Sequence, residues 1–331
     1  MTVTDTKPRI VVLDRDTLSP STRLRPPSFE HDWISHDRTD PEQVAARIAE
    51  ADIVVTNKVP VRRDALAEAK RLRLIAVAAT GTDVIDIGAC AERDIVVSNI
   101  RNYAVHTVPE HTFALILALR RSILAYHASV RRGRWAEAGQ FCYFDHPIRD
   151  LAGATLGIIG DGVLGRAVAD LGRAFGMSVL FAAYKGVSGM GPLYTPFEET
   201  LRRSDVITLH SPLMPSTRNM IAEPEFAMME RRPLLINTAR GGLVDEAALA
   251  AALEAGRIGG AAFDVLTTEP PPAGHPLMRL LDRPDFILTP HVAWASQEAV
   301  QGLAEQLIDN IEAFWRGAPV NVVRPEPPVP A

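Results

Sequence analysis

Residues 155–165 read TLGIIGDGVLG, and they are the strongest indication of the fold in the sequence. Residues 156–159 form an apolar run that predicts a buried strand, and the next six fit the pattern G-x-G-x-x-G. The residues from Val163 to Phe175 have the spacing of a helix. Such a glycine pattern alone also occurs in purely structural turns, but between a strand and a helix it brings backbone N–H groups to the phosphates of a dinucleotide. We therefore predict a dinucleotide site at Gly160, Gly162 and Gly165.

On both sides of this stretch, short β-branched runs alternate with longer amphipathic ones. Helices are expected at 41–51, 62–71 and 86–93, one long helix runs from Pro109 to about Arg132, and a polar, aromatic loop follows from Trp135 to Arg149. This alternation predicts an α/β protein with parallel sheets covered by helices on both faces. The expected strands are 10–13, 52–55, 74–77 and 95–97, then 155–159, 178–181, 206–209, 234–237, 260–263 and 286–289.

Composition excludes several classes of protein. The 331 residues suggest two domains, and 47% hydrophobic with 23% charged residues is ordinary globular composition. A net charge of −5 without a basic block argues against nucleic acid as a partner. The start of the chain lacks the apolar segment of a signal peptide, and the longest aliphatic stretch, 113–119, is too short to cross a membrane.

The cysteines and histidines bear on the cellular compartment and on the presence of a metal site. Cys90 and Cys142 are the only cysteines, so no disulfide framework is possible and a cytoplasmic location is expected. His106 and His111 flank Glu110 without the spacing of a zinc motif, and we predict no metal site.

The choice between NAD and NADP depends on the strand after the glycine-rich turn. NAD-binding domains usually carry an acidic residue there for the ribose hydroxyls, whereas this strand runs into Ala182, Ala183, Tyr184 and Lys185. Lys185 is either a ligand for the 2′-phosphate of NADP or a solvated surface lysine. The choice stays open, with a slight preference for NADP.

Three ionisable residues stand just beyond the ends of separate strands: Arg240, Glu269 and His291. Ligands of open α/β sheets bind at the carboxyl ends of the strands, so these side chains can converge. An arginine can hold the carboxylate and carbonyl oxygen of a 2-oxo acid, and a histidine oriented by a carboxylate can protonate the developing alkoxide. The set fits hydride transfer between a nicotinamide and a 2-oxo acid.

From about residue 10 to 323, the chain resembles the D-isomer-specific 2-hydroxyacid dehydrogenase family. One departure is Pro109, where the family usually has alanine; proline is tolerated at a helix start, so we expect no loss of function. The matching stretches are ATGTD at 79–83, VPEH at 108–111, GIIGDGVLG at 157–165, NTARGGLVD at 237–245, FDV at 263–265 with Glu269-Pro270, and TPH at 289–291.

The resemblance implies two doubly wound domains, a Rossmann-type cofactor domain inserted into a flavodoxin-like substrate domain. The substrate domain would comprise 1–103 and 292–331, and the NAD(P)-binding domain 104–291. Arg240, Glu269 and His291 would be the catalytic residues, with His291 the acid/base. Residues expected at the cofactor are Gly160, Gly162, Val163, Leu164, Gly165, Lys185, His210, Ser211, Pro212, Thr238, Ala239, Arg240, Asp264 and His291. Those expected at the substrate are Asn57, Lys58, Ala79, Thr80, Gly81, Arg240, His291 and Trp294.

Two of these assignments have simpler alternatives, since Asn57 and Lys58 also suit a polar turn and Trp294 also suits a core. The stretches VTNKVP (55–60) and HVAWAS (291–296) look most like family members that act on glycerate and hydroxypyruvate. We therefore expect an enzyme that reduces hydroxypyruvate and glyoxylate to D-glycerate and glycolate. The resemblance alone implies that it is a homodimer.

Three alternative functions are compatible with parts of the sequence. Phosphoglycerate- or D-lactate-type members are close rivals, although little chain follows His291 for a regulatory domain. Formate dehydrogenases of the family carry glutamine where this chain has Glu269, which disfavours that activity. A non-catalytic, dinucleotide-sensing corepressor of the same fold is the alternative from another class, and the intact Arg240, Glu269 and His291 argue against it.

Overall fold

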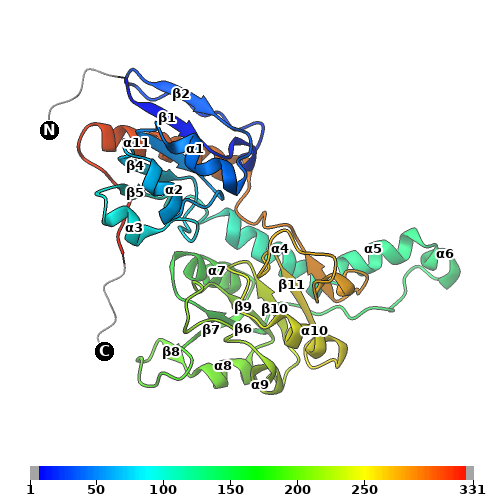
Figure 1. Cartoon of the computed structure of the whole chain (residues 1–331). Helices are drawn as coiled ribbons and strands as arrows, with labels where there is room; N and C mark the ends of the chain where they lie inside the picture. The colour runs from blue at the N-terminus through cyan, green and yellow to red at the C-terminus, as the bar shows by residue number, and fades with distance from the viewer. Residues whose placement is uncertain (1–6, 326–331) are drawn as a thin grey trace. The chain divides into compact units, whose positions relative to one another are not determined.

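The computed structural model describes residues 7–325 (Figure 1). The chain divides into two compact units, because it leaves the first after Tyr103 and returns to it after Trp294. The second unit, Ala104–Trp294, therefore contains both His291 and Trp294. The expected boundary at 291/292 lies three residues before the division after Trp294.

The first unit is built on a sheet with strand order β13-β5-β4-β3-β1-β2, in which β1 to β5 are parallel and β13 is antiparallel to β5. Strands β2-β1-β3-β4-β5 follow the flavodoxin-like order. Side chains from β3 and β4, such as Val54 and Ile75, pack with helices α1, α2 and α3, and helix α11 packs against β4. The strands are β1 (Arg9–Val12), β2 (Asp32–Ser35), β3 (Ile53–Thr56), β4 (Leu74–Val77), β5 (Val96–Ser98) and β13 (Val322–Val323). The helices are η1 (Arg15–Thr17), η2 (Pro41–Gln43), α1 (Val44–Ile48), α2 (Arg63–Glu68), α3 (Ile87–Ala91) and α11 (Gln297–Trp315).

The second unit is built on a fully parallel sheet with order β12-β11-β10-β9-β6-β7-β8. Counted from β6, this is the Rossmann order with one further strand, and the order reverses between β6 and β9. The glycine-rich turn follows β6, so it lies at this switch point. The strands are β6 (Thr155–Ile159), β7 (Ser178–Ala182), β8 (Tyr194–Thr195), β9 (Val206–Leu209), β10 (Leu234–Asn237), β11 (Gly260–Phe263) and β12 (Phe286–Leu288).

Alternate side chains of this sheet serve two cores. Leu234 and Ile236 pack with α4 and α7, whereas Leu235 faces the core shared with α8, α9 and α10. The alternation follows from the pleat of a strand covered on both faces. The helices are α4 (Thr107–Arg120), α5 (Ile123–Arg131), α6 (Arg134–Ala138), α7 (Val163–Ala174), α8 (Phe197–Arg203), α9 (Glu223–Ala227), α10 (Glu246–Glu254) and η3 (Met278–Leu280).

Two expectations about the helices were wrong. The long helix expected from Pro109 to Arg132 is two helices, α4 and α5, because Ser122 adopts a left-handed conformation (φ 50°) and its hydroxyl donates to the carbonyl of Pro147 at 2.6 Å. The segment 135–149, expected to be a loop, contains most of α6. Among residues 7–325, no single helix has both the length and the apolar character to cross a membrane; α4 and α5, bent by 56°, reach them only as a pair.

Candidate active site

The glycine-rich turn has the close backbone approaches that its pattern predicts. Gly160 has φ 107°, and a Cβ there would lie 2.6 Å from the backbone of His210. A Cβ on Gly165 would lie 2.0 Å from the carbonyl oxygen of Gly160. These two glycines let β6, α7 and the end of β9 meet.

Gly162 has a different surrounding, because a Cβ there would meet no atom within 4 Å. It is the N-cap of α7, a helix of 12 residues whose first two residues are Val163 and Leu164. Open space before the N–H groups of a helix of this length suits a pyrophosphate. The residues of the turn therefore fit a dinucleotide.

The residues expected along the rest of the cofactor lie at the ends of neighbouring strands. His210, Ser211 and Pro212 follow β9, and burial lowers the pKa of His210 to about 4, so this imidazole is neutral at physiological pH. Its Nε2 lies 2.9 Å from the hydroxyl oxygen of Thr208. Lys185 follows β7, and its ammonium lies 2.8 Å from the buried carboxylate of Glu225 and donates to the carbonyl of Met220 at 3.1 Å. The carboxylate of Glu225 therefore offsets part of the positive charge of Lys185 that was expected to attract a 2′-phosphate.

Arg240 stands on a turn that the side chain of Asn237 braces. Asn237 accepts from the N–H of Ala239 at 3.1 Å and donates to the carbonyl of Arg240 at 2.9 Å. Thr238, in the same turn, lies 3.0 Å from the hydroxyl of Thr112 on α4. A Cβ on Gly241 would lie only 2.0 Å from the carbonyl group of Leu266. The glycine therefore lets the turn that carries Arg240 touch the segment that leads to Glu269.

Glu269 and His291 form a hydrogen-bonded pair. Nδ1 of His291 lies 2.7 Å from one carboxylate oxygen of Glu269, and the other oxygen accepts from the N–H of Leu266 at 2.8 Å. Because the carboxylate is an acceptor, Nδ1 carries the proton of this bond and Nε2 is the second ring nitrogen. His291 itself has a left-handed backbone, with φ 54°, which is rare for a residue with a Cβ.

Asp264 holds the turn that carries His291. Its carboxylate, 1% exposed, accepts from the N–H groups of Val292 and Ala293 at 2.9 and 2.8 Å and from the hydroxyl of Thr289 at 2.5 Å. The N–H of His291 donates to the carbonyl of Asp264 at 2.8 Å. Asp264 was expected at the cofactor, and in the structure its carboxylate orders the main chain around His291.

Helix α4 supports the same turn from another side. Thr107 donates to the carbonyl of Ala293 at 3.0 Å, and Nε2 of His111 lies 3.2 Å from the hydroxyl oxygen of Thr289. Because the Thr289 hydroxyl donates to Asp264, His111 is the donor to Thr289. Trp294, half-buried, donates its indole N–H to the carbonyl of His291 at 2.8 Å. Sequence reasoning gave His111 and Thr289 no part in the site, although both lie within matched motifs.

In the first unit, the two segments expected at the substrate follow neighbouring strands. Asn57 and Lys58 follow β3, with Asn57 buried and Lys58 exposed, and Ala79–Gly81 follow β4. The N–H of Ala78 donates to the carbonyl of Thr56 at 2.8 Å, so the two segments start side by side. Asp14, which the sequence did not single out, accepts from the N–H groups of the 57–59 segment. Its one sequence signal is an acid placed directly after a buried strand.

Comparisons with known proteins assign the chain to one family. A doubly wound dinucleotide-binding unit with an arginine, a glutamate and a histidine beyond its strands defines a nicotinamide-dependent dehydrogenase. Residues 113–293 match the model of the D-isomer-specific 2-hydroxyacid dehydrogenase NAD-binding domain. The chain belongs to the D-isomer-specific 2-hydroxyacid dehydrogenase family. It is therefore an oxidoreductase of 2-hydroxy acids with a nicotinamide dinucleotide cofactor.

Three relatives cover nearly the whole chain. A glycerate dehydrogenase of Methylorubrum extorquens is 52% identical over 95% of this chain and 98% of its own. A hydroxypyruvate reductase of Blautia hydrogenotrophica is 36% identical over 95% of this chain and 99% of its own. The solved structure of an NADPH-dependent glyoxylate/hydroxypyruvate reductase of Sinorhizobium meliloti is 28% identical, with a TM-score of 0.80 over 96% of this chain and 98% of that one.

Proposed function

We propose that this enzyme reduces hydroxypyruvate and glyoxylate to D-glycerate and glycolate, with His291 as the proton donor. The 2.7 Å bond between Glu269 and Nδ1 of His291 carries this proposal, because it fixes the orientation of the imidazole ring and leaves Nε2 as the nitrogen that can face the substrate. The names of the Methylorubrum and Blautia relatives support the choice of substrates.

Each side chain has one task in this reaction. Arg240 binds the substrate carboxylate and carbonyl oxygen through its guanidinium. Nε2 of His291 gives its proton to the carbonyl oxygen as negative charge develops there, and Glu269 offsets the charge of the imidazolium. Reduced nicotinamide, when bound, supplies the hydride to the carbonyl carbon. The products are a 2-hydroxy acid, oxidised dinucleotide and a neutral histidine, which solvent reprotonates.

We also propose NADP as the preferred cofactor. No carboxylate occurs between Ala183 and Leu193, directly after β7, so nothing in that segment repels a 2′-phosphate. The Sinorhizobium relative is NADPH-dependent. Lys185 adds a positive charge beside this strand even though it is paired with Glu225.

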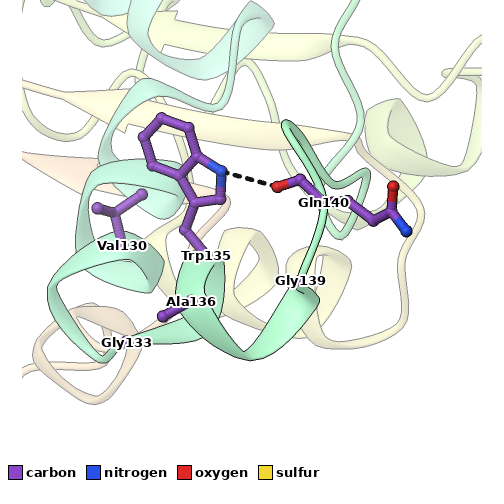
Figure 2. A pocket seen from close by; sticks show the side chains of 6 residues that line it. All are labelled: Val130, Gly133, Trp135, Ala136, Gly139 and Gln140. Carbon is purple, nitrogen blue, oxygen red and sulfur yellow. Dashed lines mark hydrogen bonds between the residues drawn. The ribbon is translucent and has the colours of Figure 1, made fainter.

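A homodimer in the cytoplasm completes the proposal. The segment 123–148 exposes a run of large apolar side chains, and α5 and α6 extend away from the second sheet (Figure 1). Figure 2 shows the hollow beside α6, where Trp135 donates to the carbonyl of Gln140 at 3.2 Å. Exposed rings gathered on one segment are typical of a surface that a second copy covers. The cysteines, both unbridged, suit a reducing compartment. The exposed apolar residues are Ile123, Leu124, Val130, Trp135, Phe141, Phe144 and Ile148.

Steady-state kinetics of His291→Asn and Arg240→Ala test the proposed roles. We expect His291→Asn to lower kcat by about 10²- to 10⁴-fold with hydroxypyruvate, since it removes the proton donor. Arg240→Ala should raise KM for the 2-oxo acid and also lower kcat, because it removes the guanidinium that binds the substrate carboxylate. A kcat/KM equal to that of the wild type in either variant would refute the role assigned to that residue.

A further inference from the structure

The loop Asn57–Val59 is closed around one buried carboxylate. Oδ1 of Asp14 accepts from the N–H of Asn57 at 2.9 Å, and Oδ2 accepts from those of Lys58 and Val59 at 2.6 and 3.1 Å. The hydroxyl of Thr56 donates to the carbonyl of Val59 at 2.9 Å and closes the loop from its other end. Three consecutive N–H groups therefore converge on a single side chain.

Burying the carboxylate of Asp14 is energetically unfavourable. It is 5% exposed, and burial raises the pKa of its carboxyl, while the N–H donors of Lys58, Asn57 and Val59 oppose that rise. A carboxylate has enough acceptor sites for all three donors, whereas an amide or hydroxyl has fewer. An ionised group kept in a core at such a cost needs a compensating set of hydrogen bonds, and the loop supplies it.

The loop borders the other segment expected at the substrate. Thr56 pairs with Val77 across β3 and β4, and the carbonyl of Thr56 accepts from Ala78, directly before Ala79–Gly81. The hydrogen bonds to Asp14 hold the segment 57–59, which lies beside the segment 79–81. The side chain of Lys58 stays exposed while its N–H is held in the core.

We propose that Asp14 is a positioning residue for substrate binding, which holds the main chain of 57–59 so that Asn57 and Lys58 meet the 2-oxo acid. The assignment of these two residues to the substrate is part of the proposed function, and this inference rests on it. Asp14 itself acts only through the loop.

Asp14→Asn tests this role, because it keeps the size of the side chain but leaves one acceptor oxygen for three donors. We expect KM for hydroxypyruvate to rise by about tenfold or more, the equivalent of about one lost hydrogen bond. We expect kcat to change much less and KM for NADPH to stay the same. Thr56→Val, which removes the bond at the other end of the loop, should raise the same KM by a smaller factor.

Val11→Ala is the matched control, since Val11 is a core residue of β1, the strand that precedes Asp14. It is 1% exposed, and its backbone pairs with β2 and β3. It should lower the melting temperature without raising KM for hydroxypyruvate. An equal rise of KM in Val11→Ala would reduce the effect of Asp14→Asn to general destabilisation. An unchanged KM in both Asp14→Asn and Thr56→Val would overturn the inference.

Hydrogen exchange separates this inference from the proposed function. In the wild type, the amides of 57–59 should exchange slowly, and Asp14→Asn should remove that protection while the amides of β3 stay protected. If the wild type reduces no 2-oxo acid, the proposed function is wrong. Unchanged exchange of the 57–59 amides in Asp14→Asn would refute the role of Asp14 in holding this segment, whatever the activity of the wild type.

Discussion

Asp14 and Asp264 have the same task in different units. Each follows a parallel strand, β1 or β11, and each accepts hydrogen bonds from successive main-chain N–H groups of a loop beside it. A backbone N–H left without a partner in a buried place costs about 1–3 kcal/mol, so one carboxylate with several donors secures a loop that no helix or strand holds. The two aspartates thus order loops that carry proposed site residues.

Lys185 and Glu225 give a prediction at the same scale. If the ammonium of Lys185 helps to bind a 2′-phosphate, Glu225 competes for it at 2.8 Å. We expect Glu225→Gln to lower KM for NADPH by roughly three- to tenfold and to leave KM for NADH unchanged, because a neutral amide holds the ammonium less tightly. Glutamine keeps an oxygen for the bond from the N–H of Ala222.

Lys185→Ala should raise KM for NADPH, because it removes the ammonium that would bind the 2′-phosphate. The control is Lys70→Ala, an exposed lysine of the first unit. If neither Lys185→Ala nor Glu225→Gln changes the ratio of the two KM values, Lys185 plays no part in the choice of cofactor.

At the scale of elements, the candidate site depends on close contact between turns. The turn after β10 and the segment after β11 touch at Gly241 and Leu266, and Leu266 in turn donates to Glu269. Helix α4 adds Thr107 and His111 at the turn of His291. The positions of the three proposed catalytic residues are therefore coupled through main-chain packing.

Gly241→Ala tests this coupling. The new Cβ would lie 2.0 Å from the carbonyl group of Leu266, so one of the two turns must move. A displacement of about 1 Å in an active site can cost about 10²-fold in rate, and we expect a fall of that size in kcat/KM. Gly274→Ala, where a Cβ meets no atom within 4 Å, should leave kinetics unchanged. Wild-type kcat/KM in Gly241→Ala would show that the turns are not coupled.

The sequence predicts the central elements better than the edges. Strands β1, β3 to β7 and β9 to β12 were expected from their apolar runs, whereas β2, β8 and β13 were missed. These three lie at the edges of their sheets, and two of them have only two residues, too few for a recognisable pattern. The break between α4 and α5 was also missed, because Ser122 bonds to Pro147, far along the chain.

The same distinction applies to the site. Arg240, Glu269 and His291 could be predicted, because each stands beyond a recognisable strand and within a family motif. Asp14 and His111 could not, because their parts depend on hydrogen bonds to segments 43 and 178 residues away. Such long-range partners leave no local pattern in a single sequence.

At the scale of the whole molecule, the chain combines a flavodoxin-like unit with a Rossmann unit inserted after Tyr103. The relatives from Methylorubrum and Blautia share nearly its full length. Within the second unit, the segment 123–148 carries the most exposed large apolar side chains, since Phe141 and Phe144 are 89% and 85% exposed.

The double variant Phe141→Ser/Phe144→Ser tests whether this segment joins two copies. By light scattering after size exclusion, we expect the wild type to have the mass of two chains and the variant that of one, because two large apolar rings leave the interface. Leu281→Ser, which removes an exposed apolar side chain outside the segment, should keep the mass of two chains. A wild type with the mass of one chain at micromolar concentration would contradict the dimer.

The substrate and cofactor of the wild-type enzyme can be measured together, by following nicotinamide absorbance with a panel of 2-oxo acids and with NADH and NADPH in parallel. The panel contains hydroxypyruvate, glyoxylate, pyruvate and 3-phosphohydroxypyruvate. We expect the highest kcat/KM with hydroxypyruvate and glyoxylate, and a higher kcat/KM with NADPH than with NADH. Absence of cofactor oxidation with every 2-oxo acid, or a clear preference for pyruvate or the phosphorylated substrate, would contradict this expectation.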